Sequence, residues 1–186
     1  MKEFPILEKN DIVLRKLELF DFVSYFDYVT DETVSKQFNF NYNQELAKNR
    51  LEELVEKYTK DNKPYIWVIA LKSTNEFIGM ITVDTVSFTN KRFSLAYGIR
   101  KKYRGNNYAY LASVILIDFI FKNFDMHRLE LAHNVDNIAS QKIIEKLGAR
   151  FEGVARESKL YNNVFKDRKI YSILKQEWME NKANEL

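Results

Sequence analysis

The chain has 186 residues, of which 46% are apolar and 30% are charged, a balance that favours one globular domain spanning residues 1–186. The net charge of +3 is too small to indicate nucleic-acid binding, and the absence of cysteine excludes disulfides and thiolate metal sites. No apolar stretch approaches the ~18 residues of a membrane span, and the first 16 residues contain no apolar run long enough for a signal peptide. We therefore expect a cytoplasmic protein that binds no membrane.

The first half of the chain predicts two helices and a group of strands. The strands expected are Ile12–Leu17, Tyr65–Leu71, Phe77–Val86 and Arg92–Ile99, and the helices expected are Leu19–Val29 and Asn43–Lys60. The last three strands follow one another closely with polar turns between them. This succession is typical of an antiparallel meander.

The second half begins with a different pattern. Tyr108–Phe124 is apolar on nearly all sides, which predicts a buried helix. After the expected strand Arg128–His133, Asn137–Leu147 reads as a short helix, with Asn137 as its N-cap and Gly148 as its stop. Two last strands are expected near Phe151–Arg156 and Arg168–Leu174. The strand–helix–strand order around the buried helix predicts a parallel pair within a mixed sheet.

The turn between Ile99 and the buried helix is a candidate anion site. A helix N-terminus presents N–H groups without helical partners and the positive end of the helix dipole, which suit a phosphate. Gly105 lets a ligand approach the backbone closely, Asn107 tolerates a left-handed conformation, and Lys102 and Arg104 add positive charge. The alternative is an ordinary turn with a solvated basic patch.

Two motifs in this half resemble those of the GNAT superfamily of N-acetyltransferases. The segment from Tyr97 to Ala109 is similar to the family's acetyl-CoA motif, Arg/Gln-x-x-Gly-x-Gly/Ala, at the start of a long helix. Asn137 and Ser140, followed by Glu-Lys-Leu-Gly, resemble the second motif. Phe151-Glu-Gly and Lys166-Asp with a later tyrosine resemble the RimJ/RimL branch, which includes acetyltransferases of ribosomal-protein N-termini.

The resemblance implies an α+β GNAT fold, in which helices flank a mixed, mostly antiparallel sheet of about seven strands with a splayed central pair. It also implies acetyl-CoA as cosubstrate, bound in the splay. The expected cofactor-binding residues are Tyr97, Ile99, Lys102, Arg104, Gly105, Asn106, Asn107, Tyr108, Ala109, Asn137 and Ser140. Two positions depart from the motif, because Lys102 replaces Arg or Gln and Asn107 replaces the second Gly or Ala.

The resemblance also implies direct attack of an amine on the thioester. Many relatives protonate the departing thiolate with a tyrosine, but Ile144 stands at that position here. Ser140 matches the RimL-type hydroxyl and is our catalytic candidate, the alternative being a hydroxyl that only bonds the backbone in the first helical turn.

The general base is the second catalytic candidate. Relatives place a glutamate at positions matching Ser94 or Lys159, and neither is a carboxylate here. Glu157 lies two residues before Lys159 and would face the same side of an extended segment, so it is our candidate. A surface charge at Glu157, with a water chain removing the proton, is the alternative. Asp84 and Tyr97 are expected to line the acceptor side.

Three classes of function compete at this point. The first is an acetyltransferase acting on a protein N-terminus, a polyamine or a small amine. The second is a module that binds acyl-CoA or a partner without turnover, and the third is a ribosome- or RNA-associated factor. No metal is expected, because the two histidines are not spaced as a helical ligand pair and no cysteine is present. Relatives occur as monomers and homodimers, and either state fits the sequence.

Overall fold

The structure, a computed structural model, describes residues 4–38, 41–60, 65–161 and 163–183. These residues form two compact units, Met1–Thr82 with Ala96–Ile115 and Val83–Leu95 with Leu116–Leu186. Strands β4 (Phe77–Ser87) and β5 (Arg92–Ile99) and helix α4 (Tyr108–Asn123) contribute to both units. We describe each unit by itself.

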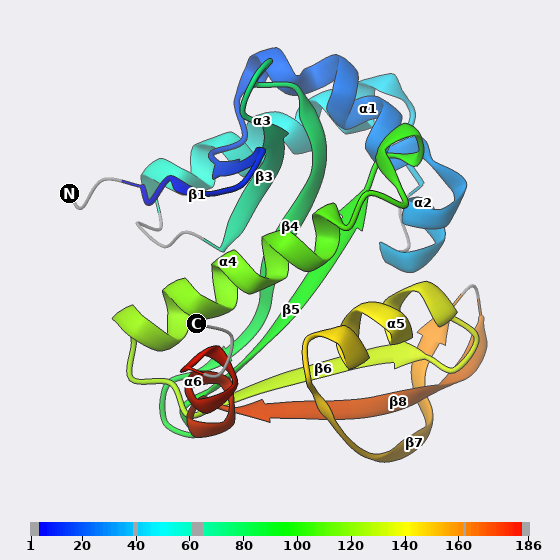
Figure 1. The fold of residues 1–186 in the computed structure, drawn as a ribbon. Helices are drawn as coiled ribbons and strands as arrows, with labels where there is room; N and C mark the ends of the chain where they lie inside the picture. The colour runs from blue at the N-terminus through cyan, green and yellow to red at the C-terminus, as the bar shows by residue number, and fades with distance from the viewer. Residues whose placement is uncertain (1–3, 39–40, 61–64, 162, 184–186) are drawn as a thin grey trace. The chain divides into compact units, whose positions relative to one another are not determined.

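The first unit combines a meander with helices. Its other strands are β1 (Leu7–Lys9), β2 (Ile12–Arg15) and β3 (Ile66–Leu71), which pair antiparallel in chain order and on to β4. Its helical segments are η1 (Leu19–Asp21), α1 (Phe22–Thr30), α2 (Glu32–Phe38), α3 (Gln44–Lys60) and η2 (Lys101–Tyr103). Figure 1 shows α1 and α3 beside the strands β3 and β4, with α2 following α1.

A shared apolar core joins these helices to the strands of the first unit. α1 contributes Tyr25, Tyr28 and Val29, which are at most 3% exposed, and α3 contributes Ala47, Leu51 and Leu54. Trp67 on β3 is 1% exposed, and its indole N–H donates to the Pro5 carbonyl over 3.1 Å. Burying such side chains stabilises the unit by roughly 1.5–3 kcal/mol each.

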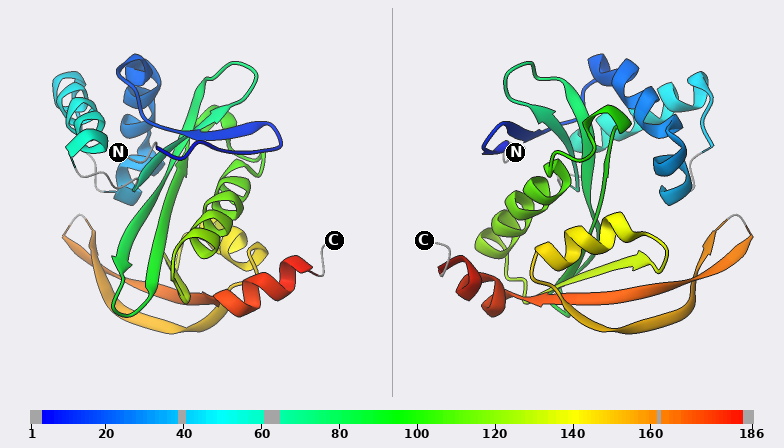
Figure 2. Two further views of the ribbon diagram at one scale, coloured as in Figure 1. Left: turned by 90° about the vertical axis from the view of Figure 1, so that its left-hand side faces the viewer. Right: turned by 45° about the vertical axis from the view of Figure 1, so that its right-hand side comes forward.

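The second unit is a sheet with a short helix on one face. Its further elements are β6 (Arg128–Asn134), α5 (Ile138–Lys146), β7 (Arg150–Tyr161), β8 (Val164–Leu174) and α6 (Lys175–Ala183). β5 pairs parallel with β6, and β6 with β8 and β8 with β7 pair antiparallel. Both views of Figure 2 show β7 and β8 as one long hairpin.

Alternation along β6 separates the two faces of this sheet. Leu129, Leu131 and His133 are buried, whereas the residues between them are partly exposed. α5 lies on the buried face, since Lys169, directly opposite His133, donates from Nζ to Gln141 Oε1 of α5 over 3.0 Å.

Helix α6 is held by one aromatic anchor. Trp178 is 4% exposed, and its indole N–H donates to Asp118 Oδ1 on α4 over 2.7 Å. Lys182 donates to the other oxygen of the same carboxylate over 2.6 Å. The polar segment of α6, which has little helical pattern of its own, is therefore held in place by these contacts with α4.

The predicted α+β class with a mixed, mostly antiparallel sheet and flanking helices is confirmed. The sheet has eight strands in the order β1-β2-β3-β4-β5-β6-β8-β7, where about seven were expected. The splayed pair corresponds to β5 and β6, whose ladder contains only Arg92–Ser94 and Arg128–Glu130. The strand β1 and the helices α2 and α6 were not predicted. Within the residues that the structure describes, no helix is long and apolar enough to cross a membrane.

Candidate active site

The turn after β5 has the backbone expected of an anion site. Gly105 and Asn107 both adopt positive φ, 86° and 59°, and α4 begins at Tyr108. The N–H of Leu111 donates to the Asn107 carbonyl over 3.0 Å, so Asn107 is the N-cap of α4. The N–H groups of the first turn therefore precede the helical hydrogen-bond ladder, where a ligand can accept from them.

The surroundings of Gly105 are open. A Cβ at this position would meet no atom within 4 Å. The glycine is thus required by its left-handed backbone and not by crowding within the protein. Beside it, the Asn106 amide nitrogen donates to the Tyr103 carbonyl over 3.2 Å and so fixes the preceding backbone.

Arg100, which the sequence analysis did not single out, fastens this turn to the first unit. Its side chain is 9% exposed, and its Nε donates to Asp27 Oδ2 over 2.7 Å. Its Nη1 donates to the Phe77 carbonyl over 2.9 Å, with Ser24 Oγ at 3.1 Å and Glu76 Oε1 at 3.3 Å. The start of the turn is therefore tied to α1 and to β4.

Both predicted basic residues of the turn have carboxylate partners. Lys102 Nζ donates to Glu76 Oε1 over 2.8 Å, and this bond lowers the pKa of Glu76. Arg104 donates to Asp31 from Nη2 and to the Ile99 carbonyl from Nε over 3.0 Å. Part of the positive charge at the turn is therefore balanced within the protein, and the binding role of both residues stays a prediction.

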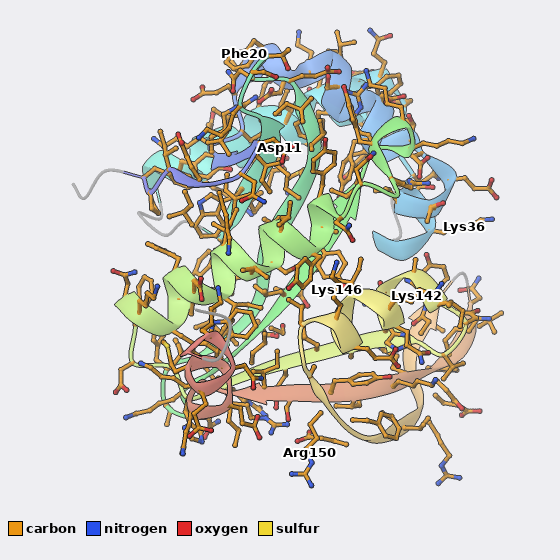
Figure 3. All side chains as sticks on the ribbon, in the orientation of Figure 1. Asp11, Phe20, Lys36, Lys142, Lys146 and Arg150 are labelled. Atoms are coloured by element: carbon orange, nitrogen blue, oxygen red, sulfur yellow. The ribbon has the colours of Figure 1, made fainter. Side chains whose placement is uncertain are left out.

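The other predicted binding residues of this unit differ in exposure. Tyr97, Ile99 and Ala109 are buried, with 7–9% of their surface exposed. Tyr108 is partly exposed. Its pKa is raised by burial, and also by the charge of Asp11 and by a hydrogen bond with that residue. Figure 3 labels Asp11.

The second predicted motif lies at the start of α5, in the second unit. Asn137 Oδ1 accepts from the Ser140 N–H over 3.0 Å, so Asn137 is the N-cap as predicted. The partly buried Ser140 hydroxyl has no hydrogen-bond partner among the described residues. The alternative considered for Ser140 was a hydroxyl that only bonds the helix backbone. Among the described residues its hydroxyl makes no such hydrogen bond.

Glu157 lies at an irregularity of the β7–β8 hairpin. The register shifts between Ala155 and Lys159, and Glu157 has φ of 49°. Its N–H donates to Asp167 Oδ1 over 2.8 Å, and its side chain is exposed. The sequence comparison of Glu157 with Lys159 assumed that this segment is a regular extended strand. That assumption is wrong, and the catalytic role of Glu157 stays a prediction.

His133 is the one histidine buried among the described residues. Its ring stacks on Tyr171 at 5.6 Å, and its Nδ1 lies 2.8 Å from the Asn134 carbonyl. This contact requires a proton on Nδ1, and the buried Nε2 has no hydrogen-bond partner within the described chain. No group of three potential ligand side chains in that part of the chain could hold a metal.

Comparison with known proteins is consistent with this geometry. Residues 11–150 match the family model described as "Acetyltransferase (GNAT) domain". The uncharacterized N-acetyltransferase p20 of Bacillus licheniformis is 25% identical over 168 residues, which cover 90% of this chain and 94% of p20.

Solved structures give the same fold. A GNAT-family acetyltransferase from Bacillus anthracis has a TM-score of 0.81 at 21% identity, covering 92% of this chain and 99% of that one. RimL, an acetyltransferase of ribosomal L7/L12 solved in complex with coenzyme A, has a TM-score of 0.77 at 16% identity, covering 91% and 98%. The family match spans well over half of the sequence, and the chain belongs to the GNAT acetyltransferase family.

Proposed function

We propose that this protein transfers the acetyl group of acetyl-CoA to a primary amine by direct attack. The observation that carries the proposal is the turn at Gly105, where two left-handed residues lead into the N-terminus of a largely buried helix. The N–H groups at the start of α4 would hold the pyrophosphate of the cofactor. Ile99 would offer its backbone to the pantetheine arm, and Asn137 would add a side-chain contact.

In the proposed reaction the acceptor nitrogen forms a bond to the acetyl carbonyl carbon, and the carbon–sulfur bond breaks. The nitrogen loses a proton to a base, for which we propose Glu157 directly or through water. The leaving thiolate gains a proton. Ser140 is suited to donate a hydrogen bond or a proton to this thiolate, because its hydroxyl has no hydrogen-bond partner among the described residues.

The first experiment asks whether acetyl-CoA binds at all. A ligand at 100 times its dissociation constant adds roughly 2.7 kcal/mol of stability, so acetyl-CoA should raise the melting temperature clearly. The absence of any shift at millimolar acetyl-CoA would refute the proposal. Release of free CoA with a panel of amines then separates an enzyme from a module that only binds acyl-CoA.

The second experiment tests Ser140. Ser140→Ala should lower kcat by about 10²–10³-fold, the loss seen when one donor to a developing negative charge is removed. The melting shift with acetyl-CoA should remain. Lys142→Ala is the matched control, since Lys142 is an exposed residue of the same helix (Figure 3) and should leave both measurements unchanged. Equal turnover for Ser140→Ala and the wild type would remove Ser140 from the mechanism. A cytoplasmic location belongs to the same proposal.

A further inference from the structure

The face of β6 and β8 opposite α5 carries polar side chains at both of its ends. In antiparallel pairs, directly opposite residues share a face, and Glu130 is opposite Ser172, Ala132 opposite Ile170 and Asn134 opposite Arg168. We call these six residues the polar face. Its middle, Ala132 and Ile170, is apolar, and Arg168 stands at one end.

The opposite end of the polar face is a closed network of charges. Arg128 donates to Glu152 from both Nη atoms and to Glu130 from Nε. Arg92 also pairs with Glu130, and the Ser172 hydroxyl donates to Glu152 over 2.8 Å. The charged groups in this network therefore all have partners.

Arg168 is different. Its Nη2 donates to the Ala132 carbonyl over 3.1 Å, and among the described residues no carboxylate lies within salt-bridge distance of it. Every other arginine that is buried or partly buried has a carboxylate partner: Arg15, Arg50, Arg100, Arg104 and Arg128. The remaining unpaired arginines, such as Arg150 (Figure 3) and Arg156, are exposed.

An unpaired guanidinium that is partly removed from water is unfavourable in the free protein. Burial lowers the pKa of Arg168, and the charge of Asp84 offsets this only in part. The exposed Asp84 carboxylate is near enough to act on Arg168 but makes no ion pair with it. A positive and a negative group of the second unit thus lie in each other's vicinity, and neither neutralises the other directly.

We propose that Arg168 binds a carboxylate of the acceptor, so that the acceptor is an amine that also carries a carboxylate. Guanidinium binds a carboxylate through two parallel hydrogen bonds, and Arg168 has donors left beyond the one given to Ala132. Asp84 then attracts the protonated form of the acceptor's amine, which gives up that proton to solvent before its nitrogen attacks the thioester. This inference rests on the proposed acetyltransferase function and specifies its substrate class.

The test compares acceptors that differ only in the carboxylate. The probes are alanine and methionine with their amides, for an amino-acid acceptor, and alanyl-aspartate with alanyl-asparagine, for an acidic peptide. The wild type should show kcat/KM about 10- to 100-fold higher for the acid of at least one pair, the gain typical of a charge-assisted hydrogen bond. Amides have less basic amines, so a preference for an amino acid over its amide cannot arise from a larger fraction of free amine.

Arg168→Gln should abolish this preference while turnover of the neutral partner remains. Arg168→Lys, which keeps the charge but not the planar fork, should retain part of it. Arg156→Gln is the matched control, an exposed arginine of the neighbouring strand β7, and should keep the full preference. Melting curves show whether each variant is folded.

Equal kcat/KM for acid and neutral partner in every pair, or a preference that survives Arg168→Gln, would overturn the inference. A loss of the acetyl-CoA melting shift in Arg168→Gln would also overturn it, because the anion would then be a phosphate of the cofactor. Failure of the proposed function is distinct, since it appears as no acetyl-CoA shift in the wild type. In that case a melting shift with alanine, its amide and the two dipeptides still tests the carboxylate site.

Discussion

Replacing Arg100 by glutamine should destabilise the first unit and weaken acetyl-CoA binding together. The change removes a bond to the buried Phe77 carbonyl, which costs about 1–3 kcal/mol when the acceptor is left unsatisfied. Asp27 is 61% exposed and regains water, so its lost pairing adds only about 0.5–1 kcal/mol. With the lost bond to Ser24, the total cost is about 3 kcal/mol.

For a chain of this length, that loss corresponds to a melting temperature lower by about 6–12 °C. Differential scanning fluorimetry measures it directly, with and without acetyl-CoA. Arg156→Gln serves as the control, because an exposed arginine without a partner should change stability by less than about 0.5 kcal/mol. A melting temperature for Arg100→Gln within 2 °C of the control, a difference below roughly 1 kcal/mol, would refute the reasoning that Arg100 fastens the turn.

Further predictions follow from the backbone and from one ion pair. Gly79→Ala should be strongly destabilising in a melting experiment, because its Cβ would lie 2.3 Å from the Gly98 carbonyl oxygen, and a variant as stable as the wild type would contradict that contact. Asn107→Val should be less stable than Asn107→Gly by about 1–2 kcal/mol, because only valine is strained at φ of 59°. Equal urea midpoints for the two variants would count against this. Burial alone would raise the pKa of Asp31, but hydrogen bonds, first from Arg104, hold it below 3.8. The stabilisation from this pair is therefore complete above about pH 4 and lost as the pH falls through the lower folded-state pKa, so Asp31→Asn should flatten that part of the stability profile.

The long elements could be predicted because each follows from a local pattern. The continuous apolar character of α4 and the apolar runs of β3 to β5 between polar turns depend on neighbouring residues, and so does the cap at Asn137. The elements that were missed depend on partners far along the chain. β1 has three residues and exists through its pairing with β2, and α6 is held by the contact of Trp178 with Asp118, 60 residues away.

The same reason explains which site residues could be found. Gly105 and Asn137 belong to motifs with fixed spacing, so the sequence alone indicates them. Arg100 depends on contacts with residues 24–27 and 76–77, and Arg168 is conspicuous only because its carboxylate partner is missing among the described residues. Pairing of charges between distant segments has no signature in local composition. The start of α2 could have been recognised from Asp31, a residue type that commonly caps helix N-termini. Its side chain accepts hydrogen bonds from the N–H groups of Thr33 and Val34.

The positions of the two tryptophans provide a means of observing each unit separately. Trp67 lies in the core of the first unit and Trp178 anchors α6 in the second, and they are the only tryptophans in the sequence. Replacing either by phenylalanine leaves a single indole as an intrinsic fluorophore. The two indoles have different polar surroundings, because Trp178 donates a hydrogen bond to a carboxylate and Trp67 donates one to a backbone carbonyl. The emission of each variant therefore reports the unfolding of one unit, and superimposable transitions would mean that the two units melt as one cooperative structure.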